Sequence, residues 1–435
     1  MDLSRSFRLA ACALLVAAAA AATQEAAAPP AGPLPTRAES SFHEGERAFW
    51  QGDLVGAELA FFEALLEDPS DARAHYYLGR IYQARDDDER ARGHFEAAAP
   101  RFAEAFFFLG AISYNQRRWE DSAAAYGRYL EYYPDDAAAW YNLGVTFDAA
   151  GRGADAVAAY EKSLAANPRQ TQALFNLAVF YHRAGDYGRA AFYWRQVLEL
   201  RPDYAEAYYG LALALAAQDD IMGAAAALNL GVGFAPLDGR FFYQLGRVYY
   251  ALGDFELATA TFIRASELGY DEGAVAEGLG LTYAGRRAYD RALPLLKRAT
   301  EVRGAAAGEA YAAIGRIERE RGRPGPALAN FYEAAARLND GADAYNEIGE
   351  IYMEEELPTY AAEAFERAVA GAPVNLTYNY NLAVAYDRSA PTRAAAQWRR
   401  YVALAEGVAG EKKRLAEAAD RLQQLTAGTP GEEKP

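Results

Sequence analysis

Residues that commonly carry catalytic or metal chemistry are few and scattered in this chain of 435 residues. The four histidines, His43, His75, His94 and His182, have no cysteine or carboxylate at the spacing of metal ligands. The sequence Gly278-Leu279-Gly280 has the form of a dinucleotide-binding loop, but no strand precedes it. Neither a Walker loop nor a nucleophile elbow occurs. We therefore predict a protein that is not an enzyme and that holds no metal or cofactor.

Charge narrows the classes of partner. The chain has 60 acidic and 44 basic residues, a net charge of -16, and no basic stripe. Nucleic acids and anionic membrane surfaces are therefore poor partners. The acidic clusters 86–89 and 354–356 lack the spacing of a calcium-binding EF-hand loop, so we expect them at solvated turns.

A pattern of about 34 residues recurs through most of the chain and predicts the elements that position these residues. Each copy has a small residue at its eighth position, and the eleven are Gly45, Gly79, Gly110, Gly144, Ala178, Ala212, Gly246, Gly280, Gly315, Gly349 and Ala383. An alanine follows twelve residues later in most copies, and an aromatic residue usually four beyond it. This spacing predicts two short helices per copy, which approach closely at the small residue. The aromatic ring is expected to fill the gap between one copy and the next.

These landmarks, with a proline that closes many copies, resemble the tetratricopeptide repeat (TPR) family. The resemblance implies an all-α fold, a right-handed α-solenoid superhelix of about eleven helix hairpins. We expect repeats one to seven at 38–272, repeats eight to eleven at 273–410 and a C-terminal capping helix at 411–427. The glycine-rich eighth repeat contains Pro294 and precedes an irregular stretch, so we also predict a joint between Gly269 and Gly308.

The N-terminus has the pattern of an export signal. Arg5 and Arg8 precede an apolar run that ends in small residues, which predicts a signal peptide at 1–22, cleaved near Ala22. Lipidation of Cys12 and an uncleaved anchor remain as alternatives, and these are the only membrane attachments that we expect. An Ala/Pro-rich linker at 23–37 and a polar tail at 428–435 are predicted to be disordered. We therefore expect a periplasmic, envelope-associated or secreted protein of the bacterial cell envelope.

One row of residues is a candidate binding surface. The fifth residue of each of the first seven repeats is aromatic, and we call the seven the aromatic row: Phe42, Tyr76, Phe107, Tyr141, Phe175, Tyr209 and Tyr243. The resemblance implies that this position faces the concave groove, where the residues are either framework or a ligand track. It also implies that asparagines at the next position, Asn142, Asn176 and Asn381, hold a ligand's main chain.

The candidate groove therefore consists of Tyr141, Asn142, Phe175, Asn176, Tyr209 and Tyr243, with His182, Arg183 and Arg247 available to an acidic group. Its predicted function is that of a scaffold for protein-protein interaction, which binds peptide segments or helices. The alternative is a carbohydrate-binding solenoid that assists exopolysaccharide secretion, in which the aromatic rings stack on sugars.

Overall fold

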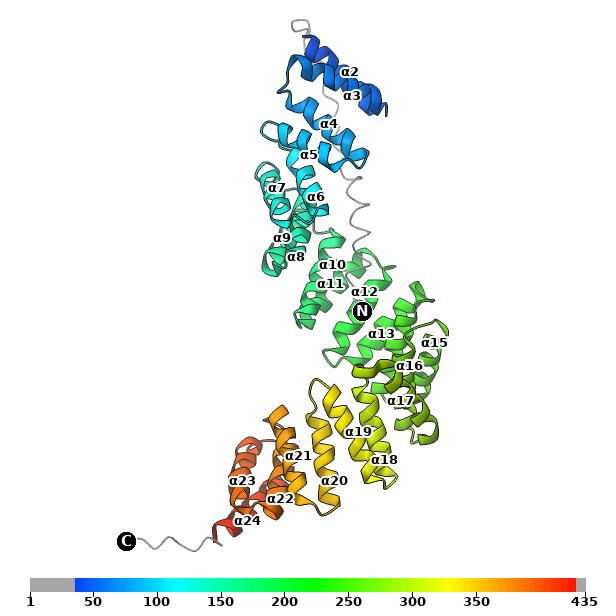
Figure 1. The fold of residues 1–435 in the computed structure, drawn as a ribbon, viewed down its shortest axis with the longest axis vertical. Helices are drawn as coiled ribbons and strands as arrows, with labels where there is room; N and C mark the ends of the chain where they lie inside the picture. Colours follow the sequence, from blue (N-terminus) through cyan, green and yellow to red (C-terminus); the bar gives the residue numbers. More distant parts are fainter. Residues whose placement is uncertain (1–35, 428–435) are drawn as a thin grey trace, which may run out of the picture. The chain divides into compact units, whose positions relative to one another are not determined.

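The structure is a computed structural model that describes residues 36–427. Within this range the chain forms α-helices, a single short 3-10 helix and no strand (Figure 1). The predicted signal peptide, the tail and all but the last two residues of the linker lie outside the described residues. No helix in the described range is long and apolar enough to span a membrane.

Successive helices pair as eleven hairpins, which confirms the all-α solenoid expected from the repeats. The hairpins are α2 (Arg37–Trp50) with α3 (Leu54–Glu67), α4 (Ala72–Ala84) with α5 (Asp88–Ala98), α6 (Ala105–Asn115) with α7 (Trp119–Tyr132), α8 (Ala137–Ala149) with α9 (Gly153–Ala166), α10 (Thr171–Arg183) with α11 (Tyr187–Leu200), α12 (Ala205–Ala216) with α13 (Ile221–Phe234), α14 (Gly239–Ala251) with α15 (Phe255–Glu267), α16 (Glu272–Gly285) with α17 (Tyr289–Arg303), α18 (Gly308–Glu320) with α19 (Pro324–Arg337), α20 (Ala342–Glu354) with α21 (Pro358–Gly371), and α22 (Leu376–Ser389) with α23 (Pro391–Ala405).

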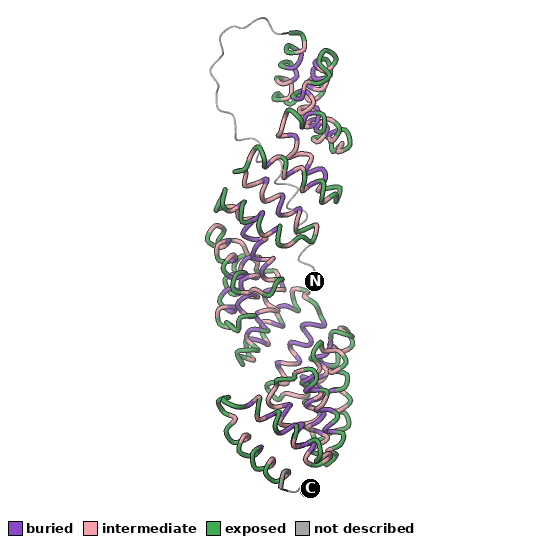
Figure 2. The backbone as a smooth tube through the Cα atoms, turned by 90° about the vertical axis from the view of Figure 1, so that its left-hand side faces the viewer, coloured by how far each residue is buried: buried purple, intermediate pink, exposed green. Residues whose placement is uncertain are grey.

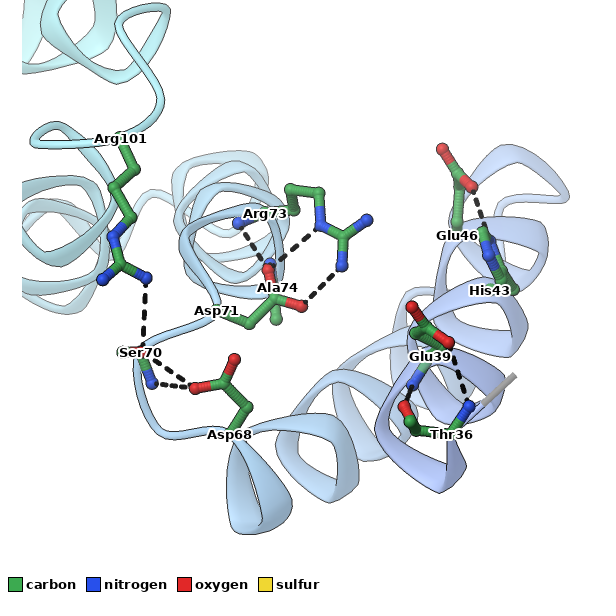
Figure 3. Close-up of polar contacts among 10 residues, drawn as sticks. All are labelled: Thr36, Glu39, His43, Glu46, Asp68, Ser70, Asp71, Arg73, Ala74 and Arg101. Carbon is green, nitrogen blue, oxygen red and sulfur yellow. Dashed lines mark hydrogen bonds and ion pairs between the residues drawn. The ribbon is translucent and has the colours of Figure 1, made fainter. Parts of the chain in front are cut away.

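Side-chain caps define where many of these helices begin. At α2 the Thr36 hydroxyl accepts from the backbone of Glu39, whose carboxylate accepts in turn from the Thr36 backbone (Figure 3). At α4 one carboxylate oxygen of Asp71 accepts from the backbone N–H groups of Arg73 and Ala74. These acceptors satisfy N–H groups that have no partner inside the helix. Aspartate caps recur at Asp53, Asp87, Asp136, Asp186, Asp220, Asp238, Asp254 and Asp271.

The turn inside a hairpin also repeats its backbone geometry. One residue of the turn has a positive φ in ten of the eleven hairpins: Gly52, Asp86, Arg117, Gly151, Gly185, Asp219, Gly253, Arg287, Gly322 and Glu356. Glycine adopts this conformation at no steric cost, whereas other residues do so with strain. Both acidic clusters lie at such turns, as their sequence predicts.

The core is a series of contacts between a small residue and an aromatic ring. A Cβ added to Gly144 would lie 2.6 Å from the ring of Tyr160, the aromatic residue of the same hairpin. A Cβ on Gly246 would be equally close to Phe262, and Phe262 also lies against Gly278 of the next hairpin. The ring therefore fills the gap between neighbours, as the spacing predicts. Buried residues accordingly concentrate where helices meet, and exposed residues mark the outer faces and turns (Figure 2).

The chain divides into two compact units, 1–166 and 167–435. The described part of the first holds α2 to α9, and that of the second holds α10 to α24 (Lys412–Ala427). In the second unit α24 covers the end of the last hairpin, where Ala418 is fully buried in a cluster with Trp398 and Tyr401. Leu415, Leu422 and Leu425 pack against the same cluster, the side expected of a capping helix.

The predicted joint between Gly269 and Gly308 lies inside the second unit rather than at the division between units. Pro294 lies within α17, Gly304 has a φ of 52°, and the 3-10 helix Gly304–Ala306 follows. A change of direction at this irregular segment stays a prediction.

Candidate ligand-binding surface

The aromatic row is built from the first helix of each hairpin. In the first unit Phe42 lies on α2, Tyr76 on α4, Phe107 on α6 and Tyr141 on α8. Each ring packs on the aromatic residue of its own hairpin, with centroids 5.7 Å apart for Phe42 and Phe61 and 5.9 Å for Tyr141 and Tyr160. These contacts give the row a framework role.

The second unit continues the row with one change of partner. Phe175 on α10 meets Trp194 at 4.7 Å, and Tyr243 on α14 meets Phe262 at 5.7 Å. Tyr209 on α12 instead packs on Phe241 of the following hairpin, at 5.3 Å.

Burial divides the row into two kinds of residue. Phe42, Phe175 and Tyr209 are buried, whereas Tyr76, Phe107, Tyr141 and Tyr243 are half-buried. Burial raises the pKa of the Tyr209 and Tyr243 hydroxyls, so both remain protonated and able to donate at neutral pH. Ligand contact by the half-buried rings stays a prediction.

The asparagines lie in different surroundings. Asn142 on α8 is half-buried; its backbone carbonyl accepts from Thr146, and no hydrogen bond among the described residues uses its side-chain amide. Asn176 on α10 is half-buried and belongs to the second unit. Asn381 on α22 donates from its amide to the side chain of Asn346 at 2.9 Å. The predicted pairing of Asn142 with Asn176 stays a prediction.

The three basic candidates lie on two first helices, α10 and α14. His182 lies near the end of α10 against the ring of Tyr187, with centroids 5.3 Å apart. Burial lowers the pKa of His182, whose buried Nδ1 has no hydrogen-bond partner in the described part of the chain. Arg183 is exposed at the same helix end. Arg247 on α14 is exposed and donates to Gln244 at 3.4 Å.

A polar network beside Tyr209 was not foreseen from the sequence. Gln244 donates to the Tyr209 hydroxyl at 3.4 Å, and so connects Tyr209 to Arg247. Arg240 donates to Glu206 at 2.6 Å and to Asp238 at 2.9 Å. Burial of Asp238 opposes its ionisation, but the hydrogen bonds from Arg240 outweigh it and lower the pKa of Asp238. The spacing of Glu206 and Arg240, one repeat apart, was the available signal.

Beyond Tyr243 the same position holds Glu277, Ala312 and Asn346, and an aromatic residue returns only at Tyr380 in the last hairpin. Glu277 on α16 is buried and ion-paired with Arg303. Asn346 on α20 donates to Glu350 at 2.8 Å. Arg319 on α18 pairs with several carboxylates of α20: Glu347 at 2.6 Å, Glu350 at 3.0 Å and Glu354. Ion pairs and amide hydrogen bonds therefore lie on α16, α18 and α20, between the aromatic residues Tyr243 and Tyr380.

No cluster of three or more His, Cys, Asp or Glu side chains within residues 36–427 has a geometry that could hold a metal ion. Two shallow hollows lie at turns, one beside Gly253 and Asp254 and the other beside Gly185 and Asp186. Neither is lined by the aromatic row.

The hairpins and their row define an α-solenoid repeat protein that presents the faces of successive first helices. The family model described as tetratricopeptide repeat matches residues 109–170, 146–194, 183–238, 243–310 and 312–374. The chain belongs to the tetratricopeptide repeat family, whose arrays are scaffolds for protein-protein interaction and are typically not enzymes.

The chain is similar to several solved structures. Yeast Tom70 has a TM-score of 0.50 and 15% identity, over 90% of this chain and 97% of that chain. The APC/C hetero-tetramer Cut9-Hcn1 has a TM-score of 0.46 and 11% identity, over 90% of this chain and 96% of that one. MamA is 25% identical with a TM-score of 0.35, over 37% of this chain and 96% of its own. No curated protein matches the sequence.

Proposed function

We propose that this protein is an exported scaffold of the bacterial envelope or extracellular space, and that its first helices grip peptide segments or helices of partner proteins. The N-terminal signal pattern of the sequence supports export. The first helices support peptide binding, because successive hairpins present equivalent positions to which successive residues of a peptide can bind.

Asn142 carries this proposal. Its amide has both a donor and an acceptor, lies half-buried beside Tyr141, and is used by no hydrogen bond in the described part of the chain. A peptide main chain offers the complementary C=O and N–H groups. Asn176 has the equivalent position on α10, and Tyr243 offers part of its ring to an apolar side chain.

The burial of Phe42, Phe175 and Tyr209 favours a protein ligand over a polysaccharide. A glycan track needs successive rings with open faces for stacking on sugars. Three of the seven rings are covered by the framework, so the row offers separate contacts rather than a continuous platform.

Pull-down from an envelope extract with the purified array tests the function. We expect retained proteins to bind the Asn142→Ala, Asn176→Ala variant more weakly by about 1 to 3 kcal/mol per unpaired group. Asn330→Ala is the matched control, because Asn330 lies on the second helix α19 and bonds the Pro326 carbonyl. Equal retention by the parent and the double variant would reject this site.

Location is tested separately. We expect cell fractionation to place the protein outside the cytoplasm, and mass spectrometry to find a mature chain that begins after Ala22. A lipid-modified Cys12 or a full-length chain would instead select one of the two anchored alternatives, and an unprocessed cytoplasmic protein would reject export.

A further inference from the structure

Helix α3 carries an apolar stripe on the side away from its core. Val55, Leu59, Phe62 and Leu66 are 64%, 63%, 40% and 83% exposed. Their spacing of four, three and four residues places them on one face of the helix. The opposite face, with Ala57, Phe61 and Ala64, is fully buried against the neighbouring helices. The stripe is therefore surplus to the packing of the first hairpin.

The other ten hairpins show that the repeat itself does not require this stripe. At the four equivalent positions, counted from the buried small residue of each second helix, they have mostly alanine, glycine, threonine or charged residues. None has more than one large apolar residue there; the single cases are Phe192, Met222, Ile263 and Tyr332. Four together on α3 are a local feature of the first repeat.

Charge around the stripe indicates the kind of partner. Helix α3 contains no lysine, arginine or histidine, and Glu58, Glu63 and Glu67 flank the stripe at 100° per residue. Glu58 accepts from Tyr82 and Arg85, and Glu67 pairs with Arg37 at 3.4 Å, whereas Glu63 is exposed. A second copy of α3 would place like charges together, and an anionic lipid surface would meet the same repulsion.

We propose that the α3 stripe docks an amphipathic helix of a partner protein, with an apolar ridge flanked by lysine or arginine. Apolar residues at heptad spacing match the anchors of helix-to-helix recognition. The basic flanks would pair with Glu63 and Glu67, and the apolar ridge would cover the four exposed side chains. Exposed apolar patches on soluble proteins commonly mark such interaction surfaces.

This surface is separate from the aromatic row. Phe42 of the row packs on Phe61, which lies on the buried side of α3. A substitution on the stripe therefore leaves the proposed peptide groove intact, and the two proposals are tested by different variants.

The test measures binding of a synthetic peptide to the full chain by fluorescence anisotropy. The peptide has about three heptads with leucine at a and d and lysine on both flanks, and a second peptide has glutamate at the flanks. The variant is Leu59→Asn, Leu66→Asn. The matched control is Phe192→Asn, Met222→Asn, because these exposed residues hold the registers of Leu59 and Val55 on α11 and α13.

We expect the lysine-flanked peptide to bind the parent and the control alike, to bind the stripe variant at least about ten-fold more weakly, and to outcompete the glutamate-flanked peptide. Circular dichroism on both variants checks that the helices remain. Equal binding to the stripe variant, equal binding of the two peptides, or no binding to the parent would overturn the proposal. So would a parent dimer dispersed by the stripe substitutions, which would make a second copy the occupant, or loss of binding to phosphatidylglycerol vesicles in the stripe variant.

Discussion

His94 on α5 is the histidine whose pKa is shifted furthest in the described structure. Its Nδ1 lies 3.0 Å from Nδ1 of His75, its ring stacks on Tyr82 with centroids 5.4 Å apart, and Phe62 contacts its edge. Burial, and then the neighbouring His75, lower the pKa of His94 to about 4. The folded protein therefore favours the neutral ring.

The sign of the pH effect follows from linkage. Between the ordinary histidine pKa of 6.5 and about 4, the unfolded chain binds a proton at His94 that the folded chain does not. We expect the free energy of unfolding of the second hairpin to fall by about 1 to 2 kcal/mol as the pH falls through this range. The loss is smaller than for a fully buried ring, because solvent screens a partly exposed one. Hydrogen exchange in α4 and α5 at pH 7, 5.5 and 4 measures it. His94→Phe should flatten the dependence, and parallel curves for parent and variant would contradict the assignment.

At the residue scale, the sequence predicts which residues form the framework of each hairpin. It does not predict which neighbouring side chain each residue of the aromatic row packs on. In seven hairpins the glycine at the eighth position meets the aromatic ring of the same hairpin, as the spacing predicts. The burial of individual row members was not predictable, because it depends on the adjoining hairpin. Tyr209 is the example: Leu228 replaces the aromatic residue of its own second helix, and Tyr209 packs on Phe241 instead.

At the scale of elements, the eleven hairpins were predictable because every copy has the small residue and most copies also have the alanine and the turn. Irregular copies gave irregular helices. The second repeat is three residues short, and both α5 and the following α6 have only 11 residues. Pro100 lies between them, and α6 begins without a side-chain cap. The turn residue with the positive φ is Gly, Asp, Arg or Glu in different hairpins, because the fold requires only its backbone conformation.

Because glycine and non-glycine residues both occupy the positive-φ position of the turns, we predict opposite effects for two substitutions there. Glu356 holds a φ of 59° at a turn where Gly322 of the previous hairpin holds 70°. Glu356→Gly should stabilise its hairpin by about 0.5 to 1 kcal/mol through relief of strain, whereas Gly322→Ala should destabilise by about 1 kcal/mol or more. Thermal unfolding of each variant gives the two signs. The same sign for both would show that backbone conformation does not decide stability at this turn.

At the scale of the whole molecule, the sequence predicted the number of repeats but not the boundary of the compact units. The division between 166 and 167 falls between the fourth and fifth repeats, which are the two most regular copies. Their motifs therefore contain no signal for it. Composition instead predicts an irregular joint in the glycine-rich eighth repeat, because glycine and proline weaken a helix when they lie in its interior. Compactness depends on how all side chains pack, which a repeat motif does not encode.

A modular molecule predicts that damage stays local, and two glycines make a matched test. Gly144→Ala would place a Cβ 2.6 Å from Tyr160, whereas a Cβ on Gly127 of α7 would meet no atom within 4 Å. We expect Gly144→Ala to destabilise by about 1 to 3 kcal/mol through overpacking, and Gly127→Ala to be neutral or to stabilise by up to about 1 kcal/mol through helix propensity. Hydrogen exchange should rise in α8 and α9 and their neighbours in Gly144→Ala, while α12 to α24 keep the protection of the parent, because each repeat buries its surface mainly against adjacent repeats. A uniform rise along the whole chain would mean that the array unfolds as one cooperative body, and the repeat-by-repeat account of its stability would then be wrong.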